Sequence, residues 1–285
     1  MKAMFITGAS GNVGREVVAA LRKHHVPMVI GARSPSRIDA APGQSVVLFD
    51  FLDSATYTSA IDQCSAMFLL RPPAISNTKA TLNKVIDAAR AAGVKHIVFI
   101  SVAGADTNLF VPHHAVEVHL RAGPPGWTIL RPGFFAQNLE SAYCEDIRDD
   151  NRNYVPAGCG RVAFVNTRDL AAVAVKALLS LEAHDGQAYT FTGPAALSFN
   201  EVAQLLSATL GRTVRYEPAS AVSYAYHLIH AGLPLAQALV QAILHIGLRF
   251  GQAATVDPTL PRLLGRAPLT MAEYIGSHSH VWLAR

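Results

Sequence analysis

Short apolar runs alternate with amphipathic segments along the first half of the chain. Six runs predict strands, at residues 4–6, 27–31, 46–49, 66–70, 96–101 and 127–130. The segments between them carry apolar residues at helical spacing, and the helix predicted over 79–92 places Leu82 and Ile86 on one face. Strands that are apolar throughout must be covered on both sides. The pattern therefore predicts an α/β protein with a parallel sheet between two layers of helices.

The regular alternation ends after residue 134. We expect a helix over 137–148, a polar loop, and then further strands and helices, at 162–165, 170–181, 189–193 and 199–210. Ser198 is the expected N-cap of the last of these helices, and the remainder is helical with Pro and Gly breaks. These segments predict a smaller, mostly helical lobe over the carboxyl edge of the sheet, where α/β proteins bind ligands.

The turn after the first apolar run carries glycines at regular spacing. Gly8, Gly11 and Gly14 form a G-x-x-G-x-x-G pattern that leads into an amphipathic helix. Glycines allow a tight turn and a close approach of backbone amides to phosphate oxygens, and the helix N-terminus adds free N–H groups and partial positive charge. This pattern predicts a dinucleotide site; a strand-to-helix turn without a ligand is the alternative.

The end of the second apolar run indicates which dinucleotide is bound. A carboxylate there suits the 2′-hydroxyl of NAD, whereas a guanidinium suits the 2′-phosphate of NADP. Arg33 holds this position and no acid does, with Ser34 and Arg37 as further candidates. The chain therefore favours NADP(H) over NAD(H), unless these arginines are ordinary solvated loop charges. Asp50 and Phe51 end the third run, where an acid and an aromatic commonly meet an adenine ring.

Composition narrows the class of protein. With 285 residues, 51% apolar and 15% charged, the chain is long enough for a large core and leaves little length for disorder. The net charge of +4 is scattered, which argues against nucleic-acid binding. Cys64, Cys144 and Cys159 show no C-x-x-C spacing, and His227 and His230 lack a third ligand. We expect no metal and a reducing, cytoplasmic environment.

Residues 222–250 are apolar enough to raise the question of a membrane span. Histidines and glutamines interrupt the segment, and residues 232–234 contain a Gly and a Pro. We expect two helices here and no membrane span. No signal peptide is expected either, because the first apolar run is only a few residues long.

Several motifs follow one another along nearly the whole chain. They are TGASGNVG at 7–14, GARSPSR at 31–37, VKHIVFISVAGAD at 94–106, TILRPGFFAQN at 128–138 and TRDLAAVAVKALL at 167–179. With them the chain resembles the NmrA-like atypical short-chain dehydrogenase/reductases, near triphenylmethane reductase and the type 2 NADPH quinone oxidoreductases. The resemblance implies a Rossmann-type doubly wound parallel sheet within an NAD(P)-binding domain of residues 1–135. It adds sheet elements from about 160–195 and a mainly substrate-binding lobe over 136–285.

The resemblance also implies a path of cofactor contacts. It gives the pyrophosphate to the loop 8–14, which includes Gly11, and chiefly to Ser10, Asn12 and Val13. It gives the 2′-phosphate to Arg33 and the adenine to Asp50 and Phe51. It places along the rest of the cofactor Leu69, Leu70, Arg71, Ser101, Val102 and the backbone of Pro132, Gly133, Phe134 and Phe135. Arg71 departs from the small polar residues common at its position, so its role stays open.

Catalysis is less clearly indicated than cofactor binding. Classical relatives use a Tyr and a Lys four residues apart for proton transfer, and this chain has no Y-x-x-x-K. At the corresponding helix it has His113 and Glu117, one turn apart on the same face, and these two with Ser101 are the candidate catalytic residues. The alternative is that His113 is a surface group at the helix start and that Glu117 is structural.

We therefore predict an NADPH-dependent oxidoreductase that transfers hydride to a small hydrophobic, aromatic or quinone-like acceptor. It would act as a monomer or homodimer, and aromatic residues of the second lobe would suit a pocket for a flat ligand. The alternative is an NADP(H)-sensing regulator of NmrA type that is catalytically weak or inactive and binds a protein partner. An isomerase using bound cofactor is disfavoured because it would need the acid–base Tyr.

Overall fold

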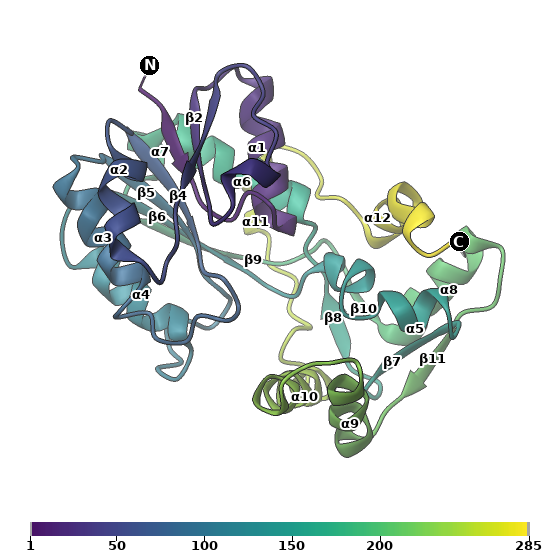
Figure 1. The fold of residues 1–285 in the computed structure, drawn as a ribbon. Helices are drawn as coiled ribbons and strands as arrows, with labels where there is room; N and C mark the ends of the chain where they lie inside the picture. The colour runs from purple at the N-terminus through teal and green to yellow at the C-terminus, as the bar shows by residue number, and fades with distance from the viewer. Residues whose placement is uncertain (1, 284–285) are drawn as a thin grey trace. The chain divides into compact units, whose positions relative to one another are not determined.

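Seven strands form the sheet at the centre of the first unit of the computed structural model, which describes residues 2–283. They are β1 (Met4–Ile6), β2 (Met28–Ala32), β3 (Gln44–Leu48), β4 (Ala66–Leu70), β5 (His96–Ile100), β6 (Gly126–Pro132) and β9 (Gln187–Phe191). The order is β3-β2-β1-β4-β5-β6-β9 and every pairing is parallel (Figure 1). This is the doubly wound arrangement of a Rossmann fold, so the predicted fold class is confirmed.

Helices cover both faces of this sheet (Figure 1). They are α1 (Asn12–Lys23), α2 (Tyr57–Ile61), α3 (Leu82–Ala91), α4 (Pro112–Arg121), α6 (Thr167–Leu179) and α7 (Leu181–His184), with short 3₁₀ turns η1 (Pro35–Arg37) and η2 (Ser54–Thr56). One face carries α1 packed on α6, and the other carries α2, α3 and α4 in sequence. Every residue of β5 is buried, as expected for a central strand covered from both sides.

The second unit consists of residues 133–166 and 192–283 and has a hydrophobic core of its own. Its helices are α5 (Cys144–Arg148), α8 (Phe199–Leu210), α9 (Ala221–His230), α10 (Leu235–Arg249), α11 (Thr259–Leu264) and α12 (Met271–His278), with 3₁₀ turns η3 (Ala136–Glu140) and η4 (Ser279–Val281). Its strands are β7 (Arg152–Val155), β8 (Arg161–Ala163), β10 (Ala196–Ser198) and β11 (Arg215–Pro218). They pair two by two, β8 with β10 antiparallel and β7 with β11 parallel.

Local sequence determined some of these elements and not others. The predicted Ser198 cap is confirmed. Its hydroxyl accepts a hydrogen bond from the Glu201 amide, and the Glu201 carboxylate accepts one from the Ser198 amide. The single helix predicted over 137–148 is wrong. The chain forms η3 and α5 instead, because Ser141 leaves helical geometry and Tyr143 turns its ring into the core. The prediction also missed β7, β10 and β11, whose partners lie far away in the sequence.

The apolar segment 222–250 forms two helices, as predicted. The first, α9, ends at His230, and α10 begins at Leu235 after a turn in which Gly232 has a φ of 90°. Across residues 2–283 no helix combines the length and the hydropathy needed to cross a bilayer. In the same range no three His, Cys, Asp or Glu side chains gather as a metal site would require.

The turn between β1 and α1 is tightly packed against itself. Gly8 has a φ of 68°, in the left-handed region that favours glycine. A Cβ on Gly14 would lie 2.1 Å from the carbonyl oxygen of Gly8, which no rotamer change can relieve because both groups belong to the backbone. The helix can therefore approach the turn this closely only with glycine at position 14.

We expect Gly14→Ala to lower the free energy of unfolding by about 1–3 kcal/mol, the usual cost of forcing a methyl into occupied space. Urea unfolding followed by circular dichroism measures this loss. Gly276→Ala is the matched control, because Gly276 lies in α12 and, apart from its chain neighbours and its own helix backbone, no heavy atom lies within 4 Å of its Cβ position. That variant should be unchanged or more stable by up to about 1 kcal/mol. Equal stability of the two variants would contradict the packing argument.

Candidate cofactor and active site

The N-terminus of α1 has the properties of a phosphate site. No side chain caps the helix and its first turn holds no acid, so its first amides lack the usual capping acceptor. Two hydrogen bonds stabilise the turn. The amide of Gly11 donates to the Gly8 carbonyl over 3.0 Å, and the amide of Leu70 donates to the Thr7 hydroxyl over 2.9 Å. These residues fit the pyrophosphate of a dinucleotide.

The residues predicted to touch the pyrophosphate are exposed to different degrees. Ser10 and Gly11 are exposed, Asn12 is half-buried, and Val13 is buried in the helix packing. Any contact of Val13 with a phosphate would therefore be made by its backbone amide.

The end of β2 carries polar side chains that the protein itself does not use. Arg33, Ser34 and Arg37 are exposed, and within residues 2–283 none of their side chains is bonded to a protein group. A guanidinium without a partner at this strand end is free to meet a phosphate. The residues present thus fit the 2′-phosphate of NADP.

The end of β3 combines a polar and a packed residue. One carboxylate oxygen of Asp50 accepts from the amide of Leu52 over 2.9 Å and stabilises the turn. The Phe51 ring is buried and packs edge-on against Phe49, with ring centroids 4.9 Å apart. Its carbonyl accepts from the Tyr57 hydroxyl over 2.6 Å. Phe51 therefore shapes this edge mainly through packing.

Arg71, directly after β4, is held by its own loop. Its Nη1 donates to the carbonyl oxygens of Pro72 and Pro73, each over 3.2 Å, and also to that of Ile75. Its Nε donates to Nε2 of His113 over 3.2 Å. Arg71 thus ties the loop after β4 to the start of α4, a connection that spacing alone did not predict.

His113 is a buried, neutral imidazole. The residue is only 8% exposed, and burial, followed by the nearby charge of Arg71, lowers its pKa to about 3. Because Nε2 accepts from Arg71, the ring proton must lie on Nδ1. That Nδ1 is buried and has no partner within residues 2–283. A buried donor without a partner is costly, so an acceptor atom brought next to this N–H would be stabilised.

Glu117 is at the centre of a buried ion network. Its carboxylate accepts two bonds from Arg131, from Nε over 2.9 Å and from Nη2 over 2.6 Å. The Ser101 hydroxyl donates to the same carboxylate over 2.6 Å, and Arg121 reaches it over 3.2 Å. Arg131 also pairs with Asp106 over 3.1 Å. The network joins the ends of β5 and β6 to α4.

This network gives Glu117 a structural part. Glu117 is 1% exposed, and its hydrogen bond to Arg131 is the largest cause that raises the arginine pKa. Arg131 and Asp106 were not among the predicted site residues, although an arginine within the apolar run of β6 indicates a buried acid partner. Ser101, whose hydroxyl is bonded to Glu117, is held in one rotamer at the end of β5.

The remaining predicted residues are divided between the two units. Leu69 is fully buried and Val102 half-buried, and Pro132 accepts from the amide of Ala103 over 3.0 Å. Gly133, Phe134 and Phe135 belong to the second unit. There the Phe134 ring packs against Phe164 and His245, and Phe135 bridges to Val165. His114, next to His113, is bonded through Nδ1 to the carbonyl of Ala105 over 2.8 Å.

Comparison with known proteins identifies close likenesses over nearly the full length. A family model described as NAD(P)H-binding matches residues 8–180. An NAD(P)H azoreductase of Xenophilus azovorans is 33% identical over 284 residues, which cover 97% of this chain and 98% of that protein. Escherichia coli NADPH-dependent quinone oxidoreductase with NADPH has a TM-score of 0.85 and 30% identity, covering 97% and 99% of the two chains. Citrobacter sp. triphenylmethane reductase with NADP(H) has a TM-score of 0.85 and 26% identity, covering 96% and 99%.

We expect Glu117→Gln to lower the free energy of unfolding by about 3–5 kcal/mol, because Arg131 would keep a buried charge without its carboxylate. Urea unfolding measures the loss. Asp149→Asn is the control, because Asp149 forms an exposed pair with Arg148 and should lose no more than about 1 kcal/mol. A loss as small as that of the control would contradict the central place given to this pair.

Proposed function

Since the chain belongs to the NAD(P)H-binding family, we propose that it transfers hydride from NADPH to a small hydrophobic acceptor of aromatic or quinone-like structure. Its relatives confirm the resemblance predicted from the sequence and the prediction of an NAD(P)H-dependent reductase. The choice of NADPH and the class of acceptor are the two further parts of the proposal.

The choice of NADPH is supported by the end of β2. Arg33 is exposed there without a protein partner, and no acid is present to bind a 2′-hydroxyl. The α1 N-terminus and the close packing of Gly14 on Gly8 supply the pyrophosphate cradle. Two structural neighbours, the quinone oxidoreductase and triphenylmethane reductase, were crystallised with NADPH or NADP(H).

The class of acceptor is inferred from the two polar side chains on the inner face of α4, Glu117 and His113. Neither is available to act as an acid toward an acceptor at neutral pH. Glu117 is occupied by Arg131, and the low pKa of His113 leaves it neutral. The nicotinamide, when bound, supplies the hydride. A conjugated acceptor spreads the resulting negative charge, so it needs a hydrogen-bond donor rather than a strong acid. Azo, quinone and triphenylmethane compounds, after which the relatives are named, are conjugated acceptors of this kind.

His113 would serve such an acceptor as a neutral donor. Its Nδ1–H is unpartnered, and Arg71 holds the tautomer by donating to Nε2. In this role Glu117 and Ser101 position α4 against the ends of β5 and β6 and take no proton. In this proposal His113 takes part in catalysis as a hydrogen-bond donor and not as an acid.

A second candidate function is that of a cofactor sensor. It is favoured by the same α4, which lacks the Y-x-x-x-K pair and whose carboxylate is engaged in ion pairs. A sensor would bind NADPH and turn over no acceptor, and it would present a cofactor-dependent surface to a protein partner.

We expect Arg33→Ala to weaken NADPH binding by about tenfold to a hundredfold, the worth of a hydrogen-bonded charge pair, and to leave NADH binding nearly unchanged. Fluorescence titration of the purified protein with each cofactor measures both constants. Arg215→Ala, which removes an exposed arginine from the second unit, is the control and should change neither. Equal weakening of NADPH and NADH by Arg33→Ala would remove the phosphate-binding role.

The reductase itself is tested by following NADPH oxidation with quinones, azo compounds, enones and triarylmethane dyes from pH 5 to 8. We expect acceptor-dependent oxidation, with no ionisation near pH 6.5 due to His113, because its imidazole stays neutral above about pH 4. His113→Gln should lower turnover by about tenfold to a hundredfold. His113→Asn should lose less, since its amide can donate near the place of Nδ1.

His119→Gln is the control for these variants, because His119 lies on the same helix and pairs with Asp87. It should leave turnover unchanged. NADPH binding without oxidation of any acceptor would favour the sensor. Equal turnover of wild type and both His113 variants would remove His113 from catalysis.

A further inference from the structure

The outer side of α10 is apolar along nearly its whole length. Leu235, Leu239 and Ile243 follow one another at four-residue spacing, and Val240 and Leu244 form a second row beside them. These five residues, here called the α10 face, are 48–67% exposed. The face therefore consists of large aliphatic side chains where a helix of a water-soluble domain normally carries polar ones.

The buried side of α10 carries fewer bulky aliphatic residues than the α10 face. Ala238 and Ala242 pack into the core of the second unit. Between these and the end of the helix, the His245 ring is bonded to the Tyr143 hydroxyl and packs edge-on against Phe134. A helix that is apolar on all sides is typical of one that is covered on all sides. The exposed rows of α10 thus have the composition of a contact surface.

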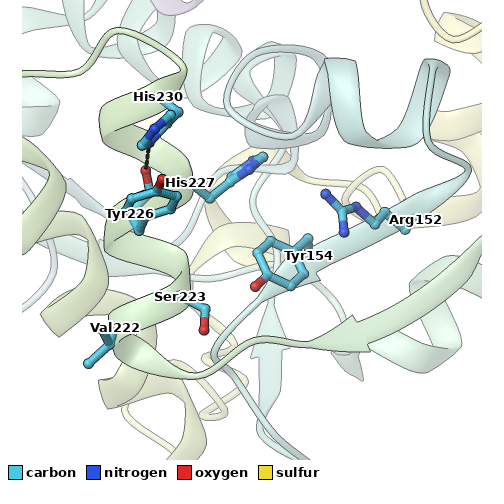
Figure 2. Close-up of a pocket in the computed structure, with 7 residues that line it drawn as sticks. All are labelled: Arg152, Tyr154, Val222, Ser223, Tyr226, His227 and His230. Atoms are coloured by element: carbon cyan, nitrogen blue, oxygen red, sulfur yellow. Dashed lines mark hydrogen bonds between the residues drawn. The ribbon is translucent and has the colours of Figure 1, made fainter.

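The polar groups of this region gather at a groove between β7 and α9 instead. Figure 2 shows this groove, whose volume is about 450 Å³. It is lined by Arg152, Tyr154, Val222, Ser223, Tyr226, His227 and His230. Buried Asp146 pairs with Arg152 over 3.2 Å and with His227 over 2.9 Å. The charges at the groove are therefore paired within the second unit, and none of them belongs to the α10 face.

The segment that holds α9 and the α10 face has no charged residue. Residues 219–248 contain no Asp, Glu, Lys or Arg. Charges around an interface steer and select partners of the opposite sign, and helices that lie on anionic membranes carry Lys and Arg beside their apolar side. The α10 face has neither, so it favours a partner surface that is as uncharged as itself.

The size and the pattern of the α10 face suit a second copy of this chain. The exposed parts of its five residues amount to about 600 Å², so two such faces would bury about 1,200 Å², the lower end for specific interfaces. Two rows at four-residue spacing form a ridge with a groove beside it. Around a two-fold axis the ridge of each helix fits into the groove of the other, because the same patch is used twice.

From these observations we propose that the protein forms a homodimer in which two α10 helices pack antiparallel across a two-fold axis near Leu239. Leu235 of one copy then lies against Ile243 of the partner subunit, and the five apolar residues of each face leave water together. Such a dimer goes beyond the proposed reductase activity, because no residue of the α10 face belongs to the cofactor site of the first unit.

Sedimentation velocity of the full chain from about 1 to 100 µM measures the dissociation constant of the dimer. We expect Ile243→Glu to raise this constant at least tenfold, because the symmetry places a carboxylate in the apolar contact twice. Leu52→Glu is the matched control, since Leu52 is 77% exposed in the first unit, and it should leave the constant unchanged. Equal constants for the two variants would overturn the proposal.

The antiparallel arrangement is tested by mixing two variants. Leu235→Lys alone should also raise the dissociation constant at least tenfold. An equal mixture of Leu235→Lys and Ile243→Glu should dimerise at least tenfold more tightly than either variant alone, because the new ammonium and carboxylate meet across the axis. Circular dichroism checks that both variants are folded.

Two results would contradict this pairing. The first is no gain in affinity on mixing. The second is a wild-type chain that stays monomeric at the highest concentration, and flotation of that monomer with phosphatidylcholine vesicles would assign the α10 face to a lipid surface instead.

Discussion

The buried pair of Glu117 and Arg131 is the interaction on which the carboxyl edge of the sheet depends. The pair joins α4 to β6, and the Ser101 hydroxyl at the end of β5 donates to the same carboxylate. Charges that are removed from water are tolerated only with nearly complete pairing. The direction of α4 is therefore set by this pair, and with it the place of every side chain on the inner face of that helix.

His113 lies one turn before Glu117 on α4, so the same ion pair determines its position. Burial keeps the imidazole neutral, and the guanidinium of Arg71 decides which nitrogen holds the proton. A neutral donor of fixed tautomer pays no cost of reorganisation when it meets an acceptor atom. The role proposed for His113 thus relies on preorganised polarity rather than on a titrating acid, unlike the Tyr and Lys chemistry of classical relatives.

The second unit follows a different physical logic. Its core is aromatic, with Tyr143, Phe199 and Trp282 fully buried, and its two small sheets join segments distant in the chain. The groove between β7 and α9 lies on this rigid support, and buried Asp146 holds its polar wall.

The sequence by itself determined the doubly wound sheet and the cofactor turn. Continuous apolar runs, the 3.6-residue period of the helices, the spacing of Gly8, Gly11 and Gly14, and the Ser198 capping box are local, because each depends on residues a few positions apart. The sequence also placed Arg33 at a strand end and His113 with Glu117 on one helical face.

Only the tertiary structure decided what those residues do. The pairing of Arg131 with Glu117, the bond from Arg71 to His113, the packed ring of Phe51, and the strands β7 and β11 all join positions that spacing does not relate. Burial set the protonation of His113, and burial is a property of the whole unit. Local patterns in the sequence reflect backbone geometry. The protonation state of a side chain and its bonding partners depend on distant segments that pack together and exclude water.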